Sequence, residues 1–389
     1  MRMHKKCGCA GSSGGDLSRR EILQAGLAAA AAVAAGSPGD LLAQNQAGKK
    51  SHTKQALGAG GMRSIDIHAH YYPQSFLDLI NEEGKPYKAD YRMTSEGFYL
   101  SAPAGSIGPL PTKFIDLKQR LADMDAQGVS MQAISLTTPM VSWADPEFSL
   151  KLSRTWNDAA SEAHQAYPTR LVALMILPML DPDRAIDELN RASKLPGMRG
   201  VYMGTNINNR DLDDALFEPI FAKIEQLGLP VFLHPLQTVG GERVKPWYLS
   251  NLLGNPFDAA IAGCHLIFGG VLDRHPKLQI CLPHGGGALP MLIGRVDHGA
   301  AVRAEIKPLH LAQPPSAYMQ RFMYDTIVHS KPVMEFLIQE VGSERIMLGS
   351  DYCFDMGYDR PIEFLEQINI SSAKRKMILR ENAARLLKL

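Results

Sequence analysis

The sequence predicts one (β/α)8 TIM barrel with a small β-hairpin insertion after its first strand. From residue 63 to the C-terminus, eight short apolar runs alternate with longer segments of helical periodicity, as expected of repeated βα units. The apolar runs are continuous, which is typical of parallel strands buried on both faces. No G-x-G-x-x-G motif follows a strand, and this disfavours an open doubly wound sheet.

The eight apolar runs are the predicted barrel strands. They cover residues 64–68, 132–136, 171–177, 199–204, 230–234, 278–284, 322–328 and 345–351. In a barrel of this class the loops after the strands form the active-site mouth. Polar side chains at the C-terminal ends of these runs are therefore the first candidates for function.

Helices are predicted between the strands, and two longer segments interrupt the alternation. The helical segments cover residues 114–128, 148–167, 181–195, 216–228 and 331–342, and several begin with Asp or Pro and end with Gly. Residues 84–112 are rich in Tyr, Phe, Gly and Pro and predict the β-hairpin. Residues 236–256 form a long loop after the fifth strand. Both segments can contribute to the mouth.

The N-terminal segment is expected to lie outside the barrel. Residues 1–44 resemble a twin-arginine export signal, with Arg19 and Arg20 before an alanine-rich apolar run. The alternative is a charged pair that opens an Ala-rich helix. The run is too short and too poor in Leu and Ile for a membrane span. We expect a flexible linker over 45–62, a barrel over 63–389, and a periplasmic or exported protein without stable membrane insertion once the signal is removed.

Composition limits the classes of partner. The chain has 389 residues, 45% hydrophobic and 21% charged, with a net charge of +1, so neither a nucleic-acid footprint nor a polybasic membrane patch is indicated. A small-molecule carboxylate is the expected partner instead. Cys264, Cys281 and Cys353 are an odd number of cysteines in apolar surroundings, which indicates buried thiols rather than a disulfide framework.

Five metal-binding or acid/base side chains follow the predicted strands. His68 and His70 end the first strand, His234 the fifth and His284 the sixth, and Asp351 ends the eighth. Residues i and i+2 of a strand point to the same face, so His68 and His70 can present two nitrogens to one ion. Imidazole and carboxylate suit zinc and its relatives. A single histidine would be weak evidence, but the set predicts a site for one divalent metal ion, with zinc expected and manganese the alternative.

Three further residues are candidates for lining the site. His329 follows the seventh strand and can support the mouth. Trp247 and Phe354 lie in loops after the fifth and eighth strands, where they can contact substrate.

Several motifs resemble the amidohydrolase-related decarboxylases, and among them the aminocarboxymuconate-semialdehyde decarboxylases. These motifs are "IDIHAH", "FLHP", "PKLQICLPHGGGALPMLIGRVDHG" and "IMLGSDYCF", within a resemblance from about residue 63 to the C-terminus. The resemblance implies metal ligation by His68, His70, His234 and Asp351, with His284 as the acid/base. It also implies a homodimer and a substrate carboxylate held by Arg295, whose guanidinium fork matches a carboxylate.

One feature departs from those decarboxylases. They carry a second carboxylate-binding arginine on the hairpin insertion, whereas this segment reads "SEGFYLSAPAGS" and has none. The difference argues against their substrate but not against the metal.

The expected activity is non-oxidative decarboxylation of a small unsaturated or aromatic carboxylic acid. A divalent ion lowers the pKa of its bound water from about 15.7 to near 7, and His284 would exchange the proton. The same groups could hydrolyse a lactone, ester or amide, or hydrate a double bond. A metal- or ligand-binding barrel without turnover is the remaining class, although such a barrel has no need of His284.

Overall fold

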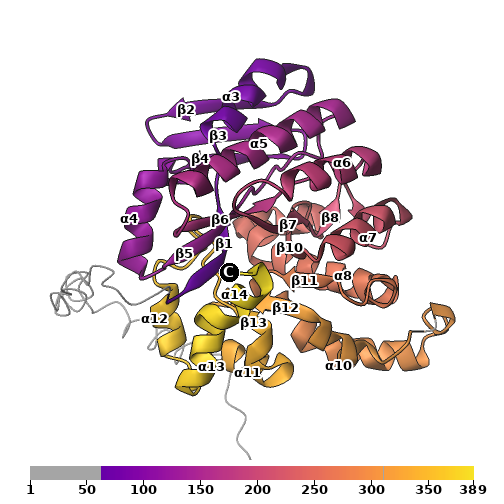
Figure 1. Ribbon diagram of the computed structural model, residues 1–389. Helices are drawn as coiled ribbons and strands as arrows, with labels where there is room; N and C mark the ends of the chain where they lie inside the picture. The colour runs from indigo at the N-terminus through magenta and orange to yellow at the C-terminus, as the bar shows by residue number, and fades with distance from the viewer. Residues whose placement is uncertain (1–62, 310) are drawn as a thin grey trace, which may run out of the picture. The chain divides into compact units, whose positions relative to one another are not determined.

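The computed structural model describes residues 63–309 and 311–389 (Figure 1). The predicted export signal and linker fall outside these residues. The described residues belong to one compact unit.

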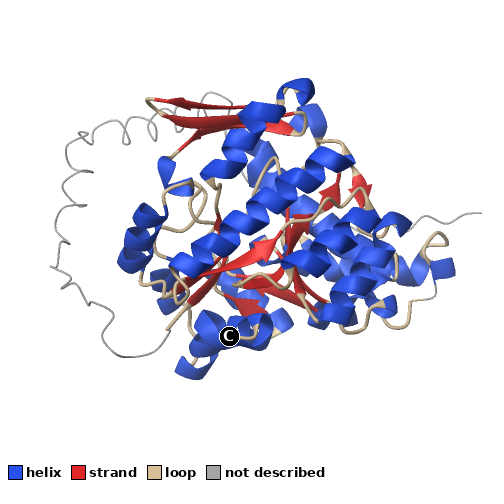
Figure 2. Ribbon diagram, turned by 45° about the horizontal axis from the view of Figure 1, so that its top comes forward, coloured by secondary structure: helices blue, strands red, loops and turns tan. Residues whose placement is uncertain are grey.

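Eight parallel strands form the predicted barrel, in the order β1-β5-β6-β7-β10-β11-β12-β13. Helices surround the strands (Figure 2). The strands are β1 (Ile65–His70), β5 (Met131–Ser135), β6 (Leu171–Met175), β7 (Met198–Gly204), β10 (Pro230–His234), β11 (Gln279–Leu282), β12 (Phe322–Asp325) and β13 (Ile346–Met347). Each predicted run overlaps one of them, because parallel strands buried on both faces are mostly apolar.

The ring closes through the segment that follows β13 rather than through a long ladder. The Ile67 N–H donates to the Leu348 carbonyl at 2.9 Å, and the Asp351 N–H donates to the His68 carbonyl at 2.9 Å. Ala69 and Tyr352 form a parallel bridge beyond them. Closure therefore brings Asp351 beside the end of β1, although the two lie at opposite ends of the barrel sequence.

The predicted helices are present and have the expected end signals. Asp116, Asp145 and Asp181 cap three of them by accepting backbone N–H groups. The main barrel helices are α4 (Leu117–Gln127), α5 (Pro146–Ala166), α6 (Pro182–Ala192), α7 (Glu218–Leu227), α8 (Asn255–Phe268), α10 (Leu289–Val302) and α11 (Lys331–Val341). Short helices α9 (Val271–Arg274), α12 (Pro361–Glu366), α13 (Ser372–Lys376) and α14 (Asn382–Leu387) complete the described chain.

The insertion is larger than the predicted hairpin. After α3 (Gln74–Glu83) the chain forms a three-stranded antiparallel sheet, β2 (Asp90–Thr94), β3 (Gly97–Ala102) and β4 (Gly105–Leu110). Gly97 explains why the third strand fits, since a Cβ at this position would lie 2.3 Å from the Leu110 carbonyl oxygen. Its φ of +133° is also one that other residues rarely adopt. Two strands of two residues each, β8 (Asn206–Ile207) and β9 (Arg210–Asp211), follow β7 and pair with each other.

Two of the three cysteines in the described residues are buried as predicted. All three thiols in the described residues are free, with Cys281 and Cys353 buried and Cys264 half-buried. Burial raises the pKa of the Cys353 thiol to about 12, so this thiol is protonated and unreactive at neutral pH.

Candidate metal centre and active site

Four predicted ligands converge at the C-terminal end of the barrel. His68 and His70 come from β1, His234 ends β10, and Asp351 follows β13. One nitrogen or oxygen from each side chain lies within 4.8 Å of the others, and all four residues are buried. Three imidazoles and one carboxylate leave room for a water or substrate oxygen on a divalent ion.

Each histidine is oriented through its Nδ1 atom. His68 Nδ1 lies 2.9 Å from Asp325 Oδ2, and His234 Nδ1 lies 2.9 Å from the Pro235 carbonyl oxygen. A carboxylate and a carbonyl both accept, so Nδ1 carries the proton in each ring and Nε2 is free to ligate. His70 Nδ1 is 3.3 Å from the Ser135 hydroxyl, which itself donates to the Ala69 carbonyl.

The Nε2 atoms of His68 and His70 both lie near the carboxylate of Asp351. His68 Nε2 is buried and has no hydrogen-bond partner among the described residues. His70 Nε2 is 2.9 Å and His68 Nε2 is 3.6 Å from Asp351 Oδ1. An unpartnered buried nitrogen is costly in a folded protein, so the residues present fit a divalent ion.

Burial and charge set the protonation of the ligands. Burial lowers the pKa of His70 to about 4 and holds that of His234 well below its usual value. For Asp351, burial raises the pKa, but the neighbouring imidazoles of His284 and His70 outweigh it and hold the pKa well below the usual range. At neutral pH His70 and His234 are therefore neutral imidazoles and Asp351 is a carboxylate, which are the ligating forms. For His68, burial lowers the pKa, but the carboxylates of Asp325 and Asp351 outweigh it and raise the pKa.

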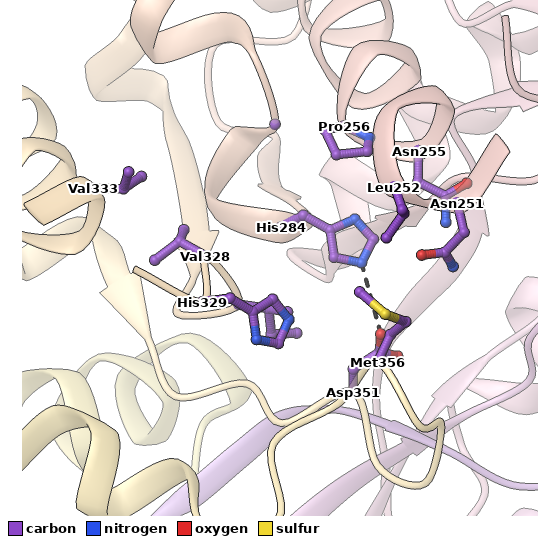
Figure 3. Close-up of a pocket in the computed structure, with 12 residues that line it drawn as sticks. Asn251, Leu252, Asn255, Pro256, His284, Val328, His329, Val333, Asp351 and Met356 are labelled. Carbon is purple, nitrogen blue, oxygen red and sulfur yellow. Dashed lines mark ion pairs between the residues drawn. The ribbon is translucent and has the colours of Figure 1, made fainter. Parts of the chain in front are cut away.

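His284 stands beside this group rather than within it. Its Nε2 lies 3.9 Å from Asp351 Oδ2, and its ring centroid is 5.5 Å from that of His68. Figure 3 shows the His284 imidazole directed toward Asp351. The backbone φ of His284 is +54°, a strained conformation for a residue with a side chain, of a kind that clusters at functional sites.

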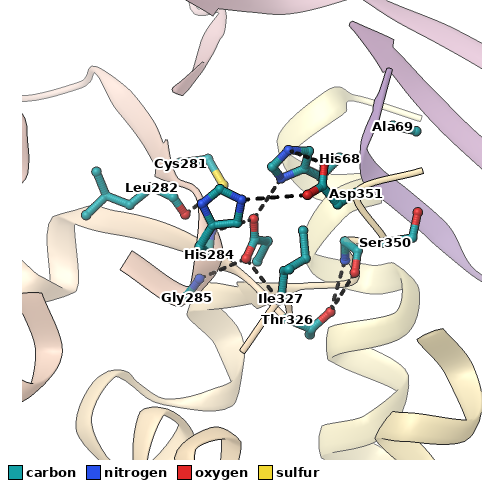
Figure 4. Close-up of polar contacts among 12 residues, drawn as sticks. His68, Ala69, Cys281, Leu282, His284, Gly285, Thr326, Ile327, Ser350 and Asp351 are labelled. Carbon is teal, nitrogen blue, oxygen red and sulfur yellow. Dashed lines mark hydrogen bonds and ion pairs between the residues drawn. The ribbon is translucent and has the colours of Figure 1, made fainter. Parts of the chain in front are cut away.

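Asp325, at the end of β12, holds both His68 and His284 in place. Its Oδ2 contacts His68 Nδ1 and accepts the His284 N–H, each at 2.9 Å. Its Oδ1 accepts the N–H groups of Gly285 at 2.8 Å and Ile327 at 3.1 Å. These contacts link the segments after β11 and β12 to β1 (Figure 4). Sequence analysis missed this residue, although it too ends a strand.

A cavity of about 260 Å³ opens beside His284. Segments after β10, β11, β12 and β13 supply its walls, and no lysine or arginine is among the lining residues (Figure 3). These residues are Asn251, Leu252, Asn255, Pro256, His284, Gly287, Ile327, Val328, His329, Val333, Asp351 and Met356. The cavity therefore joins the acid/base candidate and one metal ligand to a mixed apolar and amide surface.

Comparison with known proteins identifies the family. Residues 65–389 match the family model described as "Amidohydrolase". The chain belongs to the amidohydrolase family.

Relatives of this amidohydrolase include several decarboxylases. The 2-amino-3-carboxymuconate-6-semialdehyde decarboxylase of Dictyostelium discoideum is 31% identical over 329 residues, which is 84% of this chain and 91% of that protein. The gamma-resorcylate decarboxylase of Rhizobium sp. (strain MTP-10005) is 29% identical, covering 72% of this chain and 90% of its own. The structure of 5-carboxyvanillate decarboxylase LigW from Sphingomonas paucimobilis has a TM-score of 0.74 at 26% identity, covering 85% of this chain and all of its own.

The three predicted substrate-binding residues lie in different places in the amidohydrolase. The Phe354 ring packs edge-on against His70, with centroids 5.2 Å apart, so it borders the metal ligands. Trp247 is 84% exposed and lies outside the cavity wall. Arg295 is exposed on α10 and makes no ion pair with the described residues. Its role in binding a carboxylate stays a prediction.

A buried polar network beneath the ligands holds β1 against the closing segment. Asp66 accepts the N–H groups of His68 at 3.1 Å and Ser350 at 3.0 Å, and the Gln132 amide at 3.1 Å. Burial raises the pKa of Asp66 to about 6. The buried Arg120 guanidinium donates to Gln132 Oε1 at 2.9 Å and to the His70 carbonyl. Hydrogen bonds from the Asp66 and Arg120 side chains thus hold the β1 backbone that carries His68 and His70.

The Asp325 contacts lead to a prediction. Asp325→Asn replaces one carboxylate oxygen by an NH2 donor. Both oxygens accept backbone N–H groups in the native protein, so the NH2 group faces another donor in either amide orientation. We expect metal affinity to fall by about 10–100-fold, as for outer partners of metal-ligating histidines. Titration against a competing chelator measures this change. Asp187→Asn, an exposed carboxylate on α6, is the matched control, and an unchanged affinity in Asp325→Asn would contradict the positioning role.

Proposed function

We propose that this protein is a metal-dependent, non-oxidative decarboxylase of a small aromatic or unsaturated carboxylic acid. The observation that carries the proposal is His284, which faces the cavity beside four buried ligands without belonging to them. A storage site has no use for an acid/base group in this position. Relatives named as decarboxylases of different carboxylic acids support the same reaction class.

The reaction needs a proton to be placed on carbon. A divalent ion at the four ligands would supply a Lewis acid and an acidic bound water. His284 would give a proton to the carbon that bears the carboxylate. The bond between that carbon and the carboxylate then breaks, its electron pair returns to the conjugated system, and CO2 leaves. The low pKa of Asp351 keeps its carboxylate ionised at neutral pH, 3.9 Å from His284 Nε2.

The cavity favours a substrate with one carboxylate and an apolar body. Leu252, Val328 and Met356 line it together with the amides of Asn251 and Asn255. Because no cationic side chain lines the described cavity, we propose that the carboxylate is bound at the metal and by neutral donors. This agrees with the absence of an arginine from residues 95–106 of the insertion. An aromatic monocarboxylate with a ring hydroxyl fits these groups.

A substrate panel tests the proposed reaction. We expect the metal-loaded protein to release CO2 from at least one hydroxylated benzoate, with no release by chelator-treated protein. Turnover of lactones or aryl esters without CO2 would instead indicate a hydrolase on the same barrel. Absence of turnover in both panels would favour the binding barrel.

We propose zinc as the metal and a homodimer as the assembly. Imidazole and carboxylate ligands suit both zinc and manganese, so metal analysis of the purified protein decides between them. Sedimentation of the same sample reports the oligomeric state.

We also propose export through a twin-arginine route. Arg19 and Arg20 precede the alanine-rich run, and among the described residues no helix is long and apolar enough to span a bilayer. Replacing both arginines by lysine is expected to leave the protein in the cytoplasmic fraction, whereas Lys49→Arg with Lys50→Arg should not. An Arg19→Lys, Arg20→Lys variant that still reaches the periplasm would rule out this route.

A further inference from the structure

A second cavity lies at the opposite end of the barrel from the metal ligands. Its volume is about 270 Å³, and it contains the first residues of β10 and β11, Pro230 and Gln279, together with Arg345, which directly precedes β13. The N-terminal ends of these strands face away from the active-site mouth. We call it the basal cavity; its lining is Gly228, Pro230, Gln279, Met323, Arg345, Asn382, Arg385, Leu386 and Lys388.

The basal cavity carries three cations and no acid. Arg345, Arg385 and Lys388 line it, and no aspartate or glutamate does. None of the three forms an ion pair with any residue that the structure describes, although the chain has nearly equal numbers of acidic and basic residues. Like charges held together in a partly enclosed space repel one another, and a counter-ion would relieve that repulsion.

The donors of these side chains are only partly used. Lys388 Nζ donates to the Gly228 carbonyl at 2.8 Å, and Arg385 Nη2 donates to the Glu344 carbonyl at 3.2 Å. Arg345 Nε is buried and has no hydrogen-bond partner among the described residues. A buried N–H of a charged group without an acceptor is costly, and an anion in the basal cavity would supply one.

The cavity is held rigidly by Asn382, which lines it and is fully buried. The Asn382 amide donates to the carbonyl groups of Ser343 at 2.8 Å and Ile346 at 2.7 Å, and its oxygen accepts from Arg385 at 3.1 Å. These bonds fix α14 against β13. The backbone that carries Arg385 is therefore anchored to the segment that carries Arg345, so that binding would order little of the chain.

We propose that the basal cavity binds a small multivalent oxyanion, either a phosphate group or a polycarboxylate. Two guanidinium groups can each hold two oxygens of such an anion, and the lysine adds a third charge. Met323 and Pro230 are buried in the wall and exclude water from one side of the ligand. The inference does not depend on the reaction at the metal, because the two cavities share no lining residue.

Calorimetric titration of the metal-loaded full chain tests the proposal, with inorganic phosphate and tricarballylate as the two probes. We expect saturable binding of at least one probe, weakened by added salt, and weakened about tenfold or more in Arg385→Gln, Lys388→Gln. Both of these side chains are exposed, and an unchanged melting temperature without anion will show that the variant is folded. Lys194→Gln, an exposed lysine between α6 and β7 outside the cavity, is the matched control and should bind as the native protein does.

The outcomes separate the two cavities. Tighter binding of phosphate assigns a phosphate group to the site, and tighter binding of tricarballylate assigns a polycarboxylate. Anion binding that is equal in the native protein and the double variant places the anion elsewhere, such as at the metal, and overturns the proposal. Absence of saturable binding by the native protein also overturns it. His284→Ala should leave the basal cavity intact. This variant should therefore lose turnover but keep anion binding, which distinguishes failure of the proposed reaction from failure of the anion site.

Discussion

Replacing His284 by alanine is expected to lower turnover by about 10²–10⁴-fold, the usual contribution of a general acid/base, while metal content stays at the native level. His284 lies outside the group of four ligands, and its Nε2 is 3.9 Å from the nearer Asp351 oxygen. A proton donor in that position acts on a substrate atom in the cavity without holding the ion. Loss of activity with retained metal is the combination that identifies the role.

The backbone at His284 calls for a second variant. Its φ is +54°, and asparagine tolerates this region better than alanine does. His284→Asn should therefore fold as the native protein does and be equally inactive, since an amide does not exchange protons at neutral pH. His298→Ala, an exposed histidine on α10, is the control. If His284→Ala and His284→Asn lose their metal, His284 is a ligand and the assigned role is wrong.

The positions of the predicted metal ligands follow from strand periodicity and the fold class. His68, His70 and His234 are the last polar residues of strands buried on both faces, so the strand boundary and the fold class place them at the mouth. Asp351 follows the same logic. Its position beside β1 also depends on the closing segment after β13, which no local pattern describes.

Asp325 also ends a barrel strand, but the sequence around it hides the strand boundary. It is the fourth residue of the strand "FMYD", inside a predicted run that continued to residue 328. Because the apolar run extends three residues beyond Asp325, the sequence predicts the aspartate within the strand rather than at its end. The structure ends β12 at Asp325 and so places the carboxylate at the mouth, where it contacts His68.

The positions of the other residues, Arg295 and Asn251, depend on helix phase and loop conformation. Arg295 follows the buried Ile293 by two positions on α10, which is about 200° around a helix of 3.6 residues per turn, so it lies on the opposite face of the helix and is exposed. Asn251 reaches the cavity wall from a π-helical turn, Ser250–Gly254. Such a turn has no reliable sequence signal, because it is set by packing rather than by local propensity.

Replacing His234 by alanine is expected to have the opposite signature to His284→Ala, with metal and activity lost together. His234 Nδ1 is engaged by the Pro235 carbonyl at 2.9 Å, and burial holds its pKa well below the usual value. Its Nε2 is therefore an unprotonated ligand at neutral pH. Removing one of four ligands should weaken metal binding beyond the roughly 10–100-fold change expected for an outer partner such as Asp325.

Stability should follow the metal in this variant. A ligand bound only by the folded state adds about 4 kcal/mol at a thousand times its dissociation constant, so the melting temperature of His234→Ala in added metal should fall to that of the chelated native protein. Metal analysis and thermal unfolding, each with and without chelator, measure both effects. His298→Ala should respond to chelator as the native protein does. A His234→Ala protein that keeps one equivalent of metal would show that three ligands suffice, because the ion would then be held by β1 and Asp351 alone.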